Sequence, residues 1–330
     1  MARTLVTGAA GFIGSHLVDR LLADGHEVVA IDNLSVGRLS NLHSAREYRR
    51  FALHELGVSD PAAAPLFEGI NTVYHLAALA DIVPSIERPG DYFRANVDGT
   101  FAVVEAARRC GVRRVVYAAS SSCYGIPDEI PTPETAAIRP QYPYALTKYL
   151  GERIALHWGD VYGMATVALR FFNVYGPRAR TSGTYGAVFG VFLAQKLAGK
   201  PFTIVGDGTQ TRDFTFVSDI VEGLVVAAAS DVSGEAINLG SGSTYSINRL
   251  VELLGGTIEY IPKRPGEPDC TFANVEKAER LLGWHAKVSF EEGVRAMLEC
   301  IDDFRDAPVW DAKAIQRATE SWFAHLGGAR

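Results

Sequence analysis

Apolar and polar positions follow two rhythms along the first half of the chain. Short apolar and β-branched runs, typical of strands, are separated by longer runs with apolar residues at every third or fourth position, as in helices. Strands that alternate with helices of about 10–15 residues predict right-handed βαβ units and a parallel sheet covered on both faces. The predicted strands are residues 4–7, 27–32, 48–53, 71–75, 113–119 and 165–171, and the predicted helices are residues 12–24, 92–109 and 142–157.

The pattern changes after Asn173, where Gly and Pro become denser and the elements shorter and less regular. We expect a loop-rich lobe over the carboxyl ends of the sheet, where α/β folds bind ligands. Residues 217–229 and 236–239 return to the sheet, and residues 312–323 form an amphipathic helix with no evident chemistry. The fold class is therefore α/β, with a Rossmann-type doubly wound domain (residues 1–173, rejoined by about 213–239) and a smaller C-terminal substrate-binding lobe (residues 174–212 and 240–330).

Composition narrows the class of protein. The chain of 330 residues is 48% hydrophobic and 21% charged, with a net charge of −6 and no basic stripe, which argues against nucleic acid as a partner. No run approaches the roughly 18 apolar residues that span a bilayer, and no charged leader precedes the first strand. The four cysteines match no disulfide or metal-ligand spacing, so we expect reduced thiols, no metal and a cytosolic location.

The segment Gly8-Ala-Ala-Gly11-Phe-Ile-Gly14 lies between the first predicted strand and helix. The first glycine permits the tight turn, the second lets the backbone approach a pyrophosphate, and the third packs helix on strand. The helix N-terminus adds backbone N–H groups and the positive end of a dipole. This arrangement predicts a dinucleotide site.

Asp32 ends the second predicted strand, where a carboxylate can bind the adenosine ribose hydroxyls and repel a 2′-phosphate. It favours NAD over NADP, although the nearby Arg38 could receive such a phosphate.

Tyr144 and Lys148 lie one helical turn apart on the same face. A free phenol has a pKa of about 10 and is a poor base at neutral pH. An adjacent cation, joined by the positive charge of oxidised nicotinamide, is expected to lower the pKa of Tyr144 so that it can accept a hydroxyl proton. Three serines (Ser120, Ser121, Ser122) follow the strand at 113–119, and one could bridge a sugar oxygen to Tyr144. The alternative is a serine-rich turn satisfied by its own backbone, and spacing does not decide which serine points inward.

With these residues in place, the chain resembles the extended short-chain dehydrogenase/reductase family, and within it the UDP-hexose 4-epimerases. The likeness runs from Thr4 to about Trp284. The motifs that carry it begin at Gly8, Asp32, His75, Asn96, Ser120, Pro143, Arg170, Gly206 and Arg264.

The resemblance implies a role for each site residue. Ser120 assists the catalytic Tyr144, together with Lys148. NAD is held by Gly8, Gly11, Phe12, Ile13, Gly14, Asp32, Asn33, Leu76, Ala77, Ala78, Asn96, Tyr144 and Lys148. The UDP-sugar is held by Ser120, Ser121, Ser122, Asn173, Ala187, Val188, Arg212, Arg264, Glu267 and Thr271. Among these, Asn173 lies at the diphosphate, the two arginines bind the phosphates, and Glu267 binds the uridine ribose. Family members pair through helices equivalent to 92–109 and 142–157, so we expect a homodimer.

One position departs from the family pattern. Gly57 stands where the family usually carries an acid that meets the adenine edge, or the segment is shifted. The adenine contact is left open.

The residues after Ser120 favour one reaction. A 4,6-dehydratase needs an acid–base pair, which its family members carry as Asp-Glu directly after the assisting hydroxyl. Here those positions are Ser121 and Ser122, so we expect an epimerase, and UDP-glucuronate decarboxylase is disfavoured on the same ground. The alternatives are a nucleotide-sugar dehydratase or dehydrogenase with an unlocated acid, and a non-catalytic dinucleotide-binding regulator, which would not need Tyr144 and Lys148.

The choice of sugar is argued from small residues. Thr271 matches a gate position whose bulk is thought to exclude N-acetylated sugars, and Ala187 widens the floor of the pocket. We expect turnover of UDP-GlcNAc/UDP-GalNAc and/or UDP-Glc/UDP-Gal, with the sugar and the nucleotide base left open.

Overall fold

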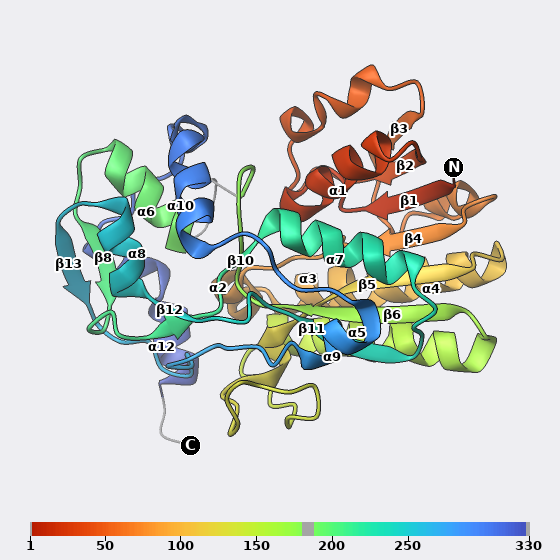
Figure 1. Cartoon of the computed structure of the whole chain (residues 1–330). Coiled ribbons are helices and arrows are strands. Elements are labelled where there is room, and N and C mark those ends of the chain that lie inside the picture. The colour runs from red at the N-terminus through yellow and green to blue at the C-terminus, as the bar shows by residue number, and fades with distance from the viewer. Residues whose placement is uncertain (1, 180–187, 328–330) are drawn as a thin grey trace.

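A seven-stranded sheet forms the centre of the computed structural model, which describes residues 2–179 and 188–327 (Figure 1). All neighbouring strands are parallel, in the order β11-β6-β5-β4-β1-β2-β3. The strands are β1 (Arg3–Thr7), β2 (Glu27–Ile31), β3 (Phe51–His54), β4 (Thr72–His75), β5 (Arg114–Ser120), β6 (Ala165–Phe171) and β11 (Glu235–Leu239). The chain order reverses between β1 and β4, which is the point where open α/β sheets bind ligands.

The sheet has a separate hydrophobic core on each face. Helices α1 (Phe12–Ala23) and α7 (Val217–Ala229) pack against one another over one face, where Leu17 and Leu224 are fully buried. Helices α4 (Gly99–Arg109) and α5 (Pro143–Tyr162) cover the other, where Val103 and Ala155 are fully buried. The near-continuous apolar strands are thus buried on both sides. The predicted Rossmann-type, doubly wound fold is confirmed.

Three predicted elements have other bounds in the structure. The strand expected at 48–53 begins at Phe51, because residues 48–51 form a turn in which Phe51 N donates to the Tyr48 carbonyl at 3.1 Å. The helix expected at 142–157 runs on to Tyr162. The helix expected at 92–109 begins at Pro89 and is not uniform: α3 (Pro89–Phe93) and α4 are joined by a π-helical turn, Arg94–Asp98. That wide turn carries Asn96, whose side chain bonds away from the helix, as described below.

The second half of the chain builds a smaller body with its own core. Strand β8 (Phe202–Val205) pairs in parallel with β13 (Ile258–Ile261), and three helices pack around them: α6 (Val188–Leu197), α8 (Ile247–Leu254) and α10 (Phe290–Glu299). Figure 1 shows this group beside the carboxyl ends of the large sheet. Short pairs link the two bodies, β7 (Val174–Tyr175) with β10 (Thr215–Phe216) and β9 (Thr211–Arg212) with β12 (Tyr245–Ser246). Helix α9 (Glu276–Leu282) packs against β11.

The C-terminal helix expected at 312–323 is two helices, α11 (Ala312–Ala318) and α12 (Glu320–Leu326). They meet at Thr319, which leaves the helical conformation (φ −110°, ψ 6°) and donates its hydroxyl to the carbonyl of Ile315 at 2.8 Å. Side-chain bonds of this kind compete with helix geometry. The break turns α12 toward α2 (Ile82–Glu87), against which it packs.

The described residues, 2–179 and 188–327, contain no membrane-spanning helix, no metal-binding cluster and no disulfide. None of the helices there is both long and apolar enough to cross a bilayer. No group of three or more His, Cys, Asp or Glu side chains is arranged to hold a metal ion. The four cysteines are free thiols.

Candidate active site

A cavity of about 1010 Å³ opens at the carboxyl ends of the parallel strands. Its wall includes the residue that follows or ends each of four adjacent strands: Gly8 after β1, Asp32 after β2, Leu76 after β4 and Ser120 at the end of β5. Every predicted site residue in the described part of the chain lines this cavity except Asn96. Ala187 and the small-residue loop around it lie outside the described residues.

The glycine turn is shaped for close approach of a ligand. Gly8 has φ +68°, and a Cβ there would lie 2.8 Å from the backbone nitrogen of Ala77. A Cβ on Gly14 would lie 2.1 Å from the carbonyl oxygen of Gly8. Helix α1 starts directly afterwards, so its first backbone N–H groups have no partner within the helix and face an anion site. This cradle, which side chains would fill, fits a dinucleotide pyrophosphate.

Asp32 is fixed at the end of β2 by backbone donors. Its carboxylate accepts hydrogen bonds from Ala10 N (2.9 Å) and Leu34 N (2.8 Å), while burial raises its pKa. Arg38 donates to the carbonyls of Arg178 (3.3 Å) and Ala179 (3.5 Å) and so contacts the segment after β7. A carboxylate in this place fits ribose hydroxyls. At the open adenine position, the cavity wall is formed by Leu56, Gly57, Val58 and Ser59.

Asn96 does not face the cavity. Its amide oxygen accepts from Leu79 N (2.8 Å), and its amide nitrogen donates to the Leu79 carbonyl (3.0 Å) and to Thr147 Oγ1 (3.0 Å). Buried and engaged at both ends, it ties the loop after β4 to helix α5. The direct cofactor contact expected of it is replaced in the structure by bonds within the protein.

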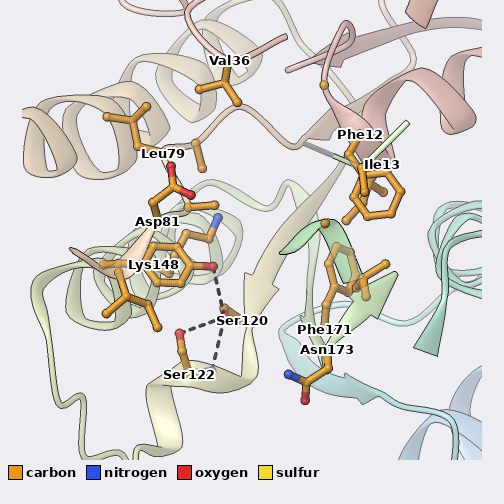
Figure 2. Close-up of a pocket in the computed structure, with 18 of the residues that line it drawn as sticks. Phe12, Ile13, Val36, Leu79, Asp81, Ser120, Ser122, Lys148, Phe171 and Asn173 are labelled. Atoms are coloured by element: carbon orange, nitrogen blue, oxygen red, sulfur yellow. Dashed lines mark hydrogen bonds between the residues drawn. The ribbon is translucent and has the colours of Figure 1, made fainter. Parts of the chain in front are cut away.

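The structure distinguishes between the three serines. The Tyr144 hydroxyl donates to Ser120 Oγ at 3.3 Å, and Ser120 Oγ lies 2.8 Å from Ser122 Oγ (Figure 2). The backbone N–H of Ser122 also donates to Ser120 Oγ at 3.3 Å. Ser120 is therefore the serine beside the phenol, and its local turn is what aims it there.

The expected lowering of the Tyr144 pKa is not produced by the chain itself. Burial raises the pKa of Tyr144, the Ser120 hydrogen bond opposes that rise, and the charge of Asp81 adds to it. Lys148 is not among the groups that shift it; its Nζ lies 4.4 Å from the centre of the Tyr117 ring. Helical spacing alone puts the ammonium near the phenol, but removal from water outweighs it.

Lys148 is itself strongly perturbed. Burial lowers the pKa of its ammonium to about 7, and the carboxylate of Glu152, one turn further along α5, opposes that change. Glu152 is held by the Arg170 guanidinium through two bonds, Nε to Oε2 at 2.8 Å and Nη2 to Oε1 at 2.6 Å. The i, i+4 spacing of Lys148 and Glu152 was visible in the sequence, but Arg170 comes from a different element, β6.

Arg170 also joins the ends of three strands. Its Nη1 donates to the Tyr124 hydroxyl at 2.7 Å, and that hydroxyl donates to Asn238 Oδ1 at 2.7 Å. Asn238 lies in β11 and Tyr124 follows β5, so a buried polar chain crosses β5, β6 and β11 just below Ser120. Such a network holds one geometry only when every member is satisfied.

At the other end of the cavity two arginines converge on Glu267. Arg212 Nη2 lies 3.0 Å from Glu267 Oε1, and Arg264 Nη1 lies 3.9 Å from Oε2. Thr271 donates its hydroxyl to Asn173 Oδ1 at 2.6 Å. Two guanidiniums against one carboxylate leave an excess of positive charge, which suits a diphosphate. Val188 begins α6 at the cavity wall.

Many residues of the cavity wall were not predicted from the sequence, and three of them act on or contact predicted site residues. Asp81 precedes α2 and lies on the same side of the cavity as Lys148 and Ser120 in Figure 2. Tyr142 stacks on Tyr144, with ring centroids 6.4 Å apart and planes at 6°. Trp322 reaches the cavity from α12. Of these three, only Tyr142 could have been found from the sequence, because it stands two residues before Tyr144.

Comparison with known proteins decides the family. A profile of the NAD dependent epimerase/dehydratase family matches residues 4–240. The chain belongs to this family. The predicted extended short-chain dehydrogenase/reductase assignment and the NAD cofactor are thereby confirmed.

Similar proteins cover almost the whole chain. A UDP-glucose 4-epimerase of Mycolicibacterium smegmatis is 39% identical over 90% of this chain and 97% of its own length. UDP-glucuronic acid decarboxylase 1 of Xenopus tropicalis is 34% identical over 88% of this chain and 70% of its own. Among solved structures, the UDP-N-acetylglucosamine 4-epimerase of Methanobrevibacter ruminantium, in complex with UDP-N-acetylmuramic acid, has a TM-score of 0.87 at 31% identity, covering 92% of this chain and 98% of that one.

Proposed function

We propose that this enzyme is an NAD-dependent UDP-sugar 4-epimerase that interconverts UDP-GlcNAc/UDP-GalNAc and/or UDP-Glc/UDP-Gal through a transient 4-keto sugar. The observation that carries the proposal is the Tyr144–Ser120 hydroxyl pair, 3.3 Å apart, within a cavity that also holds the glycine turn and the two arginines. A dinucleotide and a nucleotide sugar would therefore share one cavity, with the hydroxyl pair in its wall.

The chain's own residues supply binding and proton transfer. NAD supplies the hydride acceptor and a positive charge that favours the Tyr144 phenolate. Tyr144 takes the proton of the sugar 4-hydroxyl, Ser120 holds that oxygen by a second hydrogen bond, and Tyr144 returns the proton after the keto sugar turns over. Lys148 lies on the same face of α5, where burial lowers its pKa to about 7, so it is partly protonated at neutral pH.

Dehydration is the second candidate, and Asp81 is the observation that favours it. Sequence reasoning found no carboxylate near the catalytic pair, whereas Asp81 lines the cavity and its charge acts on Tyr144. Dehydration needs both an acid and a base besides the tyrosine, and Ser121 and Ser122 provide hydroxyls only. Epimerisation, which needs neither, fits the residues present better. The Asp81 charge would also oppose a glucuronate carboxylate.

The proposal of acetamido sugars rests on Thr271, a small side chain in the cavity wall. Its hydroxyl is bonded to Asn173, so the predicted gate and the predicted diphosphate residue touch. A bulky replacement at Thr271 would therefore disturb both the gate and Asn173, so the test of the gate has to distinguish these two effects.

The decisive assay is incubation of the purified enzyme with UDP-, GDP-, CDP- and dTDP-sugars, followed by mass spectrometry and NMR of the products. Epimerisation leaves the mass unchanged and alters the coupling of the sugar protons, whereas dehydration removes one water. Tyr144→Phe should lose turnover while NAD stays bound, and Tyr260→Phe, on an exposed tyrosine, serves as the matched control. Near-normal turnover by Tyr144→Phe would contradict the mechanism.

We also propose that residues 1–173 and about 213–239 hold NAD, while residues 174–212 and 240–330 hold the UDP-sugar. The third core supports most of this division, since all its members except Phe214 come from the second group. Ala278, Leu282 and Trp284 of that group pack instead in the core over α1 and α7.

A homodimer through α4 and α5 is the proposed assembly. Apolar side chains on and beside these helices stand exposed: Phe93, Phe101, Leu146, Val161 and Tyr162. Pairing two copies would bury them. Phe101→Glu should convert the dimer to a monomer in analytical ultracentrifugation, and Tyr260→Glu should not.

A further inference from the structure

Helix α12 is part of the wall around the site. The sequence gave residues 312–323 no chemistry, yet Trp322 is only 3% exposed and lines the cavity with Tyr142 and Arg264. Helix α12 packs on α2, the helix that follows Asp81. Figure 1 shows α12 at the lower edge of the smaller body, away from the dinucleotide turn.

The Trp322 ring makes three directed contacts. Its Nε1 donates to the carbonyl of Pro265 at 2.7 Å, directly after Arg264. The Arg264 guanidinium carbon lies 5.6 Å from the centre of the ring, within cation–π range. The ring of Tyr142 lies 6.1 Å away, and Tyr142 in turn stacks on Tyr144. One side chain thus touches both the predicted phosphate arginine and the aromatic neighbour of the catalytic phenol.

A second bond fixes the helix that carries the ring. Ser321 Oγ donates to Glu87 Oε1 at 3.1 Å, and Glu87 ends α2, the helix that follows Asp81. The adjacent Phe323 is 38% exposed and does not line the cavity. The helix therefore presents one residue to the site and not its neighbour.

From these contacts we infer that Trp322 is a positioning residue for the nucleotide sugar: it holds Arg264 and Tyr142 in the geometry that binds the diphosphate beside Tyr144. The inference rests on the proposed function, since it assigns Arg264 to the phosphates. Its pairing with Arg264 restricts the guanidinium to the cavity side, and the Pro265 bond fixes the backbone that carries it.

The test is isothermal calorimetry with UDP, which needs no turnover, combined with steady-state kinetics. A cation–π contact and one hydrogen bond together correspond to about tenfold weaker UDP binding in Trp322→Ala. Trp322→Phe keeps the ring and should recover most of that loss. Phe323→Ala, one residue along the same helix, should bind UDP like the wild type. In kinetics, KM should rise in Trp322→Ala more than kcat falls.

The outcomes separate the two proposals. If the wild type binds no UDP, the proposed nucleotide is wrong. If the wild type binds UDP and Trp322→Ala binds it equally well while melting at a lower temperature, Trp322 is structural only and the inference is overturned. If Trp322→Ala does not fold, Trp322→Leu, which also lacks the ring and its N–H group, takes its place: an unchanged UDP affinity or a kcat-only defect in that variant overturns the inference, and weaker UDP binding with a raised KM supports it.

Discussion

The buried pair of Glu152 and Arg170 offers a quantitative test of what holds the catalytic helix. Their two bonds, at 2.8 and 2.6 Å, join side chains that are 1% and 6% exposed. Glu152→Gln leaves the guanidinium buried without a counter-charge, which costs about 3–5 kcal/mol. For 330 residues the entropy of unfolding is about 0.7 kcal/mol/K, so the melting temperature should fall by about 4–7 °C.

A surface pair supplies the matched control. Arg3 and Glu27 are 2.8 Å apart but 41% and 53% exposed. An exposed pair of this kind contributes about 0–1 kcal/mol, so Glu27→Gln should shift the melting temperature by no more than about 1.5 °C. The double variant Glu152→Gln/Arg170→Met removes both charges and should regain part of the loss. Differential scanning calorimetry measures all three, and a Glu152→Gln shift no larger than that of Glu27→Gln would refute the reasoning.

The same variant has a second readout at the active site. Glu152 raises the pKa of Lys148 against the lowering by burial, so its removal should bring that pKa below about 7. Lys148 then loses its charge at lower pH, and the limb of the kcat/KM profile that follows this loss should move to more acid pH. If the limb does not move, the pKa of Lys148 that governs activity does not depend on Glu152.

Three further predictions concern the ligand-binding residues. Gly14→Ala would place a Cβ 2.1 Å from the Gly8 carbonyl oxygen, so NAD binding should be lost in a fluorescence titration. Gly90→Ala serves as the control, because the nearest atom to its Cβ position is the Arg94 Nη1 at 3.4 Å and its φ is not positive. Asp32→Asn keeps the size of the side chain but removes its charge, and should narrow the preference for NAD over NADP in the same titration; an unchanged preference would mean that the charge does not discriminate. Thr271→Tyr should reduce turnover of UDP-GlcNAc before that of UDP-Glc. Thr271→Val, which loses the hydroxyl bonds to Asn173 Oδ1 and from Asp213 N without adding bulk, should lower both equally; equal losses in the tyrosine variant would refute the gate.

The strands could be read from the sequence because each carries its signal within itself. A short run of β-branched or apolar residues such as Thr4-Leu5-Val6-Thr7, all four of which are buried, is enough to predict a strand buried on both faces. The helix at 92–109 was predicted without its π turn for the opposite reason. Its periodicity holds on both sides of the π turn, and the turn itself depends on Asn96 meeting Leu79 and Thr147, contacts that no local pattern contains.

The site residues show the same contrast between local signals, which the sequence reveals, and contacts between distant segments, which it does not. Residues tied to the ends of strands, such as Gly8 and Ser120, were found because a βα connection places them at one edge of the sheet. Trp322 was missed because it comes to that edge from more than 170 residues beyond Tyr144, on a helix whose break at Thr319 is set by side-chain bonding.

The pKa of Tyr144 shows where residue spacing stops being a sufficient guide to chemistry. A lysine one turn away predicts a stabilised phenolate, but the two groups share a site from which water is largely removed, and burial raises the pKa of the phenol while lowering that of the ammonium. Burial therefore shifts both groups toward their neutral forms. The positive charge of oxidised nicotinamide would favour the phenolate, so proton transfer at Tyr144 should be coupled to the presence of oxidised cofactor. Titration followed by tyrosine absorbance should accordingly show a phenolate at lower pH in the NAD complex than in the apoenzyme. Tyr144→Phe should remove this difference. If both forms of the wild type titrate alike, the cofactor does not lower the pKa of Tyr144.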